Sequence, residues 1–167
     1  MSVDLEDIVG ELAPRLLRYA TGRTSDSGLG EEVAQEALAA LVQRWRRFGP
    51  PDSPEAFVFA IARRRAGRAV LRRRLSLPLA VLALRPVMGP DPEAEAVSNA
   101  TARKVRAALA RLSRLDRESL LLVTAGDLRA ADAARLLGIS ESGVRMRTLR
   151  ARRRLAALLE DRHGPRR

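Results

Sequence analysis

The stretch RAADAARLLGISESGVRMRTLRARRRLAAL, residues 129–158, decides the fold of this chain. Two segments with the apolar spacing of helices meet at Gly138, a residue that readily adopts the left-handed conformation ending a helix. Ser140 is then expected to cap the second helix, and Glu141 lies near the positive end of its dipole. A short helix, a glycine turn and an arginine-rich second helix are typical of a helix-turn-helix, which enters the major groove of DNA.

The second helix of this hairpin has two faces. Residues three or four positions apart predict the buried face: Val144, Thr148, Ala151 and Leu155. Polar and long side chains occupy the rest of the surface, among them Ser142, Arg145, Met146 and Arg150. An ordinary helical hairpin with a solvated basic face is the alternative interpretation. The turn, the cap and the arginines together favour DNA binding.

The composition of the whole chain favours helices. Of the 167 residues, 46% are hydrophobic but only 3% are aromatic, and the strong helix formers Ala and Leu dominate. No stretch alternates apolar and polar residues with the period of a β-strand. We therefore expect an all-α protein with two small helical domains, residues 1–74 and 100–167, of which the second contains the helix-turn-helix. The proline-rich residues 75–99 are expected to form the linker between them.

Charge is distributed unevenly along the chain. The net charge is +11, to which residues 1–60 contribute −4, residues 61–90 contribute +8 and residues 91–167 contribute +7. Residues 61–74 hold seven arginines and no acid, an arrangement that a polyanion would neutralise. This polarity indicates two partner surfaces, one for a protein and one for a polyanion.

Several kinds of chemistry have no residues to support them. The chain has no cysteine, and its single histidine is His163 near the C-terminus. We expect no disulfide, no metal site, no cofactor and no enzymatic activity. No signal peptide is visible, and the longest apolar run, residues 75–84, is too short to span a bilayer. We therefore expect a cytoplasmic protein without membrane insertion.

Apolar spacing also predicts the individual helices. They are expected at residues 4–20, 31–47, 54–74, 100–113 and 117–124. The glycine-rich residues 21–30 are expected to form a loop. Ser53 and Pro54 predict the N-cap and first residue of the third helix, and Phe57 and Ile61 its buried stripe. Asp116 is expected to cap the fifth helix.

The order of these parts resembles the extracytoplasmic-function sigma factors of bacterial RNA polymerase, the smallest members of the sigma-70 family. The resemblance covers about residues 5–160. It is strongest at residues 120–155, where a helix ending in LGIS precedes one closing in RARRRL. EEVAQEA, residues 31–37, resembles the segment that grips the polymerase clamp helices. FVFAIAR, residues 57–63, resembles the helix that follows the pocket loop for promoter melting.

The resemblance implies a subunit that binds the clamp helices and flap of core RNA polymerase and directs it to promoter DNA. Residues expected on the clamp-binding face are Glu32, Gln35 and Glu36. Residues expected at the −10 element are Phe48, Ser53, Phe57, Arg63, Arg64 and Arg68. Residues expected at the −35 element are Ser140, Ser142, Arg145, Met146, Arg147 and Arg150. Because anti-sigma factors are common in the family, such a protein is a candidate partner.

This chain departs from the family pattern at several positions. The family often has Trp, Asn and Asp where Phe57, Arg64 and Arg68 stand, and Leu where Thr148 stands. Two alternatives to a promoter-directing subunit therefore stay open. One is a stand-alone helix-turn-helix transcription regulator. The other is a polymerase-binding protein with a degenerate −10 function, which sequesters its partner without supporting initiation.

Overall fold

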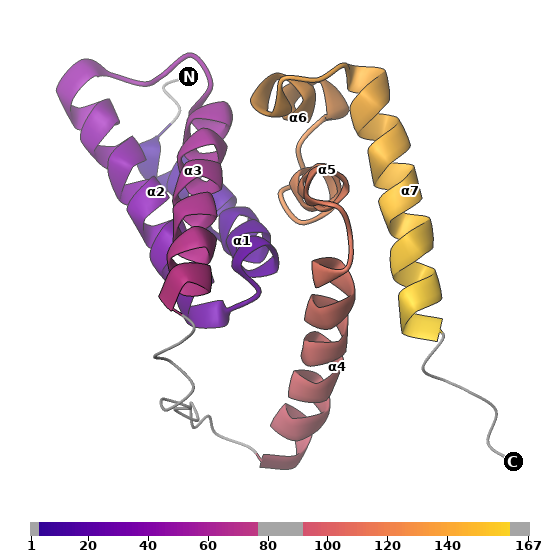
Figure 1. Cartoon of the computed structure of the whole chain (residues 1–167). Helices are drawn as coiled ribbons and strands as arrows, with labels where there is room; N and C mark the ends of the chain where they lie inside the picture. Colours follow the sequence, from indigo (N-terminus) through magenta and orange to yellow (C-terminus); the bar gives the residue numbers. More distant parts are fainter. Residues whose placement is uncertain (1–3, 77–91, 161–167) are drawn as a thin grey trace, which may run out of the picture.

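The expected all-α fold is confirmed. The structure, a computed structural model, describes residues 4–76 and 92–160, which are helical apart from short connections (Figure 1). The helices in these ranges are α1 Leu5–Thr24, α2 Ser27–Phe48, α3 Pro54–Ser76, α4 Pro92–Ala110, α5 Arg114–Thr124, α6 Ala130–Leu137 and α7 Glu141–Glu160. Helices α1–α3 pack together, and α5 lies between them and α7. None of the described helices is both long and apolar enough to cross a membrane.

The expected loop at residues 21–30 is wrong, because helices occupy both of its ends. Only Ser25 and Asp26 connect α1 to α2. Ser25 has a left-handed φ of 59°, and the Asp26 side chain caps α2 by accepting a 2.9 Å hydrogen bond from the Leu29 amide. A Cβ on Gly30 would lie 2.6 Å from Thr21 Cα. This glycine therefore permits two helices to approach closely, rather than giving the chain freedom to form a loop.

The buried face of α3 is shifted from the predicted stripe. Its buried side chains are Val58, Phe59, Ala62 and Ala66, whereas Phe57 and Ile61 are half-buried. Helix α3 contacts α1 and α2 in its own bundle and α6 in the other. Contact with several neighbours buries a wider surface than the single stripe that helical periodicity identifies.

Helix boundaries on both sides of the predicted linker, and the start of α5, also differ from those expected. Helix α3 continues to Ser76 and α4 begins at Pro92, so helices extend into both ends of the predicted linker, residues 75–99. The rest of that predicted linker, residues 77–91, lies outside the described residues. Helix α5 begins at Arg114 with Ser113 as its N-cap, because the Ser113 hydroxyl accepts a 3.2 Å hydrogen bond from the Asp116 amide. The predicted cap at Asp116 is therefore wrong by three residues.

The two helical halves share one continuous hydrophobic core. Two glycines allow the halves to meet closely. A Cβ on Gly22 would lie 2.6 Å from the side chain of Leu121, and one on Gly126 would lie 2.8 Å from the ring of Phe59. Arg15 of α1 donates 3.0 Å and 3.2 Å hydrogen bonds to the carbonyl oxygens of Gly126 and Asp127. The interface is thus closely packed and hydrogen-bonded.

Candidate nucleic-acid interface

The turn between α6 and α7 has the geometry of a helix-turn-helix. Gly138 has a left-handed φ of 67°, and its amide donates to the carbonyl oxygen of Ala134, which ends α6. The Ser140 hydroxyl accepts a 3.1 Å hydrogen bond from the Gly143 amide and so caps α7. These are the local structures that the sequence predicted at both positions. They fix the direction in which α7 leaves the turn.

Helix α7 buries one face and exposes the other. Val144, Thr148 and Ala151 are buried, as predicted. The predicted −35 residues that are exposed are Ser140, Ser142, Arg145, Met146 and Arg150. Met146 is 64% exposed and Leu149 is 44% exposed, so this face of α7 also offers apolar surface to a partner. Helix α7 lies on the side of the molecule away from α1–α3 (Figure 1), so this surface is not covered by the N-terminal bundle.

Asp116 of α5 attaches two of the α7 arginines to the bundle. Its Oδ1 atom lies 3.0 Å from Nη1 of Arg147 and 3.2 Å from Nη2 of Arg150. Burial alone would raise the pKa of Asp116, but interactions with Ser113, Arg147 and Arg150 outweigh it and lower this pKa. Arg147 is half-buried. It is therefore held against α5, whereas Arg145 is exposed and, among the described residues, forms an ion pair only with Glu141 on its own helix.

Asp116→Asn is expected to reduce stability at pH 7, and this loss is expected to shrink as the pH falls below about 4. Because the folded state lowers the pKa of Asp116, its contribution is fully present above the unfolded value of about 4 and is lost as the pH falls through the folded value. Urea unfolding of both proteins at pH 7 and pH 2 measures the difference. Asp52→Asn is the control, since Asp52 is exposed and pairs with no described residue. A difference that persists undiminished at pH 2 would contradict the ion-pair explanation.

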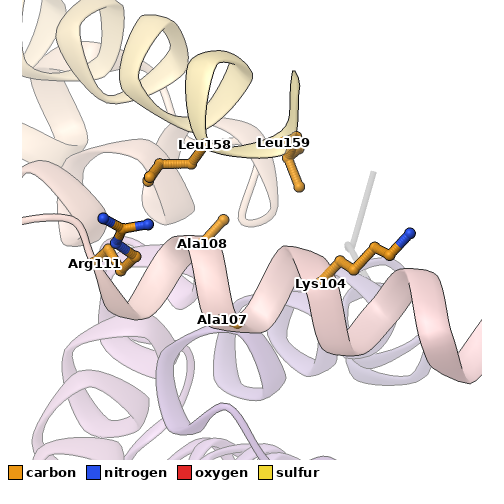
Figure 2. A pocket seen from close by; sticks show the side chains of 6 residues that line it. All are labelled: Lys104, Ala107, Ala108, Arg111, Leu158 and Leu159. Atoms are coloured by element: carbon orange, nitrogen blue, oxygen red, sulfur yellow. The ribbon is translucent and has the colours of Figure 1, made fainter. Parts of the chain in front are cut away.

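The C-terminal end of α7 packs against α4. Leu158 and Leu159 line one side of a small groove there, and Lys104, Ala107, Ala108 and Arg111 line the other (Figure 2). The volume of the groove, about 40 Å³, has room for only a few water molecules. The contact therefore fixes the far end of α7 and leaves its N-terminal half to meet a partner.

Thr148→Val is expected to stabilise the protein by about 1 kcal/mol. The Thr148 hydroxyl is buried and has no hydrogen-bond partner among the described residues. Valine has nearly the same shape and carries no polar group that must lose its water. Thermal unfolding checks the prediction. Thr124→Val is the contrasting variant, because the Thr124 hydroxyl donates a 2.7 Å hydrogen bond to the Leu120 carbonyl oxygen, and it should not be stabilised.

Phe48 is the most exposed aromatic ring of the predicted −10 residues. It ends α2, is 69% exposed and lies 5.3 Å and 5.6 Å from the guanidinium carbons of Arg44 and Arg47. Ser53, five residues later, caps α3 by accepting a 3.2 Å hydrogen bond from the Ala56 amide, as predicted. An exposed ring beside two cations can stack on an unpaired base.

The other predicted −10 residues differ in their exposure to solvent and in their contacts. Phe57 is half-buried against the core. Arg64 and Arg68 are exposed along the later turns of α3. Arg63 instead donates a 3.2 Å hydrogen bond to Glu118 of α5. The structure therefore presents Phe48, Arg64 and Arg68 to solvent and holds Arg63 at the contact between the two halves.

A buried polar cluster at this contact was missed by sequence reasoning. The Glu118 side chain is 1% exposed and pairs with Arg23, which is 4% exposed, as well as with Arg63. The Tyr19 hydroxyl donates a 3.4 Å hydrogen bond to the same carboxylate, and burial together with Glu118 strongly raises the pKa of Tyr19. The available signal was an acid two residues before the aliphatic residues Leu120–Leu122. That signal does not identify a partner 95 residues away.

The predicted clamp-binding residues lie on the first half of α2. Glu32 and Gln35 are exposed, and Gln35 donates a 3.4 Å hydrogen bond to Glu31. Glu36 is half-buried and pairs with Arg65 of α3. Glu32 and Gln35 are therefore accessible to a partner, while Glu36 helps to attach α2 to α3.

Comparisons with known proteins agree with this architecture. Residues 8–75 match the family model of sigma-70 region 2, and residues 102–155 match that of sigma-70 region 4. The chain is 32% identical to the ECF RNA polymerase sigma factor ShbA of Streptomyces griseus, over 93% of this chain and 87% of the relative. It is 27% identical to the ECF RNA polymerase sigma factor EcfG of Rhodopseudomonas palustris, over 93% and 84% of the two chains.

Solved structures share the fold. The sigma factor RpoE of Bartonella quintana, in complex with the anti-sigma factor NepR, aligns with a TM-score of 0.66 at 22% identity, over 93% of this chain and 96% of that one. CnrH, in complex with the cytosolic domain of CnrY, aligns with a TM-score of 0.67 at 22% identity, over 94% and 88% of the two chains. With both sigma-70 regions present in order and a relative above 30% identity over nearly the whole chain, this protein belongs to the extracytoplasmic-function sigma factors, which direct bacterial RNA polymerase to promoters.

Proposed function

We propose that α7 reads the −35 element while the ends of α2 and α3 receive the −10 strand. The exposed face of α7 carries this proposal. Its Ser142, Arg145 and Met146 are exposed directly after the capped turn, where a recognition helix meets base edges. Phe48 with Arg64 and Arg68 supports the second half of the proposal, because single strands bind exposed rings beside cations. In this proposal the polymerase performs all the chemistry.

Arg145→Ala is expected to lower transcription from a cognate promoter about tenfold, because an arginine that grips a guanine contributes about 1–3 kcal/mol of discrimination. Run-off transcription with purified core polymerase measures the effect on promoters selected by the wild-type protein. Substituting each base pair of the −35 element in turn shows whether the loss of transcription comes from a lost base contact. If Arg145 reads a base, the variant becomes insensitive to one position; a uniform loss across all sequences would mark a phosphate contact. Arg103→Ala, an exposed arginine on α4, is the control.

The polymerase-binding half of the proposal rests on α2. Glu32 and Gln35 are exposed on one side of the helix, opposite its buried Val33, Ala34 and Ala37. Glu32→Lys is expected to weaken co-elution with core polymerase without changing the helical content. Retained promoter activity in cells after this change, together with its loss in Arg145→Ala, would instead favour a stand-alone regulator.

An anti-sigma factor is also a proposed partner. The support is that the aligned RpoE structure contains one, NepR. The pairing is tested by recovering the chain from its native host and identifying the proteins that accompany it. Recovery of polymerase subunits alone would argue against this partner.

A further inference from the structure

A cleft lined by six arginines lies between α3 and α5. Its volume is about 440 Å³, within the range of about 300–1,000 Å³ that small-molecule sites occupy. The arginines come from three helices: Arg23 of α1, Arg63, Arg64 and Arg68 of α3, and Arg114 and Arg117 of α5. None of the described residues that line it is acidic.

The positive charge of this cleft is only partly compensated. Glu118 lies behind its wall and pairs with Arg23 and Arg63. Arg64, Arg68 and Arg114 are exposed and form no ion pair with a described residue. The position of α5 across the cleft from α3 brings these like charges together and costs free energy, which an anion in the cleft would recover. Guanidinium groups bind phosphates through paired hydrogen bonds, so a phosphate chain suits the cleft best.

One part of the cleft wall is apolar. Gly67, Val70 and Leu71 of α3 line it beside the arginines, and Leu71 is 58% exposed. A ligand that combines a phosphate chain with a flat, weakly polar group would cover both parts of this surface. A nucleotide has that combination.

We propose that this cleft binds a nucleoside polyphosphate, which bridges the two halves of the chain through Arg68 and Arg114. The site shares Arg63, Arg64 and Arg68 with the predicted −10 surface and extends beyond that surface to Arg114 of α5. DNA phosphates attracted to α3 alone are the competing explanation. Arg114 distinguishes the two, since it contributes only if the ligand spans both halves.

Isothermal titration of the full chain with ATP at physiological salt tests the proposal. We expect one ATP per chain, with about tenfold weaker binding in both Arg68→Ala and Arg114→Ala, since each removes a charge-assisted hydrogen bond. Arg153→Ala is the matched control, because Arg153 is an exposed arginine on α7 outside the cleft, and it should bind ATP like the wild type. Wild-type affinity in Arg114→Ala, or an equal loss in Arg153→Ala, would overturn the bridging site.

Inorganic tripolyphosphate forms the second arm of the titration. It shares the phosphate chain of ATP but has no nucleoside to cover Val70 and Leu71. We expect it to bind at the same site several-fold more weakly than ATP. Equal affinity for the two ligands would overturn the nucleoside part of the proposal.

Discussion

Glu118→Ala is expected to cost about 3–5 kcal/mol of stability and to separate the two helical bundles. The substitution removes the carboxylate that pairs with Arg23, and only 4% of that arginine side chain is exposed. It also removes the acceptor of the Tyr19 hydroxyl. Without Glu118 the Arg23 guanidinium lies unpaired in the wall of the arginine-lined cleft with little water around it, and its full hydration requires α5 to move away from α1. The domain contact is therefore expected to open before either bundle unfolds.

Urea unfolding and small-angle scattering measure the two parts of this result. The wild type is expected to unfold in one transition, and the variant in two with a larger radius of gyration. Glu31→Ala is the control, since Glu31 is exposed and its carboxylate accepts a hydrogen bond from Gln35 alone among the described side chains. The double variant Arg23→Leu with Glu118→Leu should recover most of the lost stability, because neither charge is then buried alone. A single transition of unchanged midpoint in Glu118→Ala would show that the buried pair does not hold the halves together.

The helix-turn-helix could be predicted because its determinants are local. The left-handed Gly138, the Ser140 cap and the spacing of Val144 and Ala151 all act within one or two helical turns. The exposed positions of Arg145 and Met146 follow from the same periodicity. An all-α fold follows from composition in a similar way. These features need no knowledge of which segments meet in space.

The contact between the halves could not be predicted for the opposite reason. Arg23 and Glu118 are 95 residues apart, and each is an ordinary charged residue in its own segment. Arg63 was expected at the −10 element, yet in this structure it pairs with Glu118, because α3 has neighbours on both sides. Periodicity within one helix identifies a preferred buried face, but it does not show how many other helices will pack against that helix.

The other wrong prediction, a loop at residues 21–30, came from the glycines in that stretch. The stretch 21–30 contains Gly22, Gly28 and Gly30, and local rules interpret such a cluster as a loop. In the structure all three are helical, and Gly22 and Gly30 stand where another segment approaches closely. A glycine can be needed because the backbone must adopt a conformation that other residues avoid, or because no side chain would fit at that position. Only the tertiary contacts of the glycine show which of the two reasons applies.

Gly30→Ala is expected to destabilise the N-terminal bundle by about 3 kcal/mol or more. The added Cβ would lie 2.5 Å from the Thr21 hydroxyl, 2.6 Å from Thr21 Cα and 2.7 Å from its amide nitrogen. A flexible side chain could turn aside, but two of these three atoms belong to the backbone of α1. The helices must therefore separate along their crossing, which loosens the packing of Leu16 and Tyr19 against α2 and α3.

Two glycine substitutions in the same pair of helices provide the comparison, measured by thermal and urea unfolding of the full chain. A Cβ on Gly10 of α1 meets nothing within 4 Å, and one on Gly28 of α2 meets only the Asp26 side chain, at 3.5 Å. Both alanine variants gain helix propensity, and Gly10→Ala is expected to stabilise the protein by about 0.5–1 kcal/mol. If the change in unfolding free energy has opposite signs for Gly10→Ala and Gly30→Ala, the effect of close helix approach is separated from the effect of backbone entropy. If Gly30→Ala were instead as stable as Gly10→Ala, α1 and α2 would have to cross at a greater distance than the structure gives.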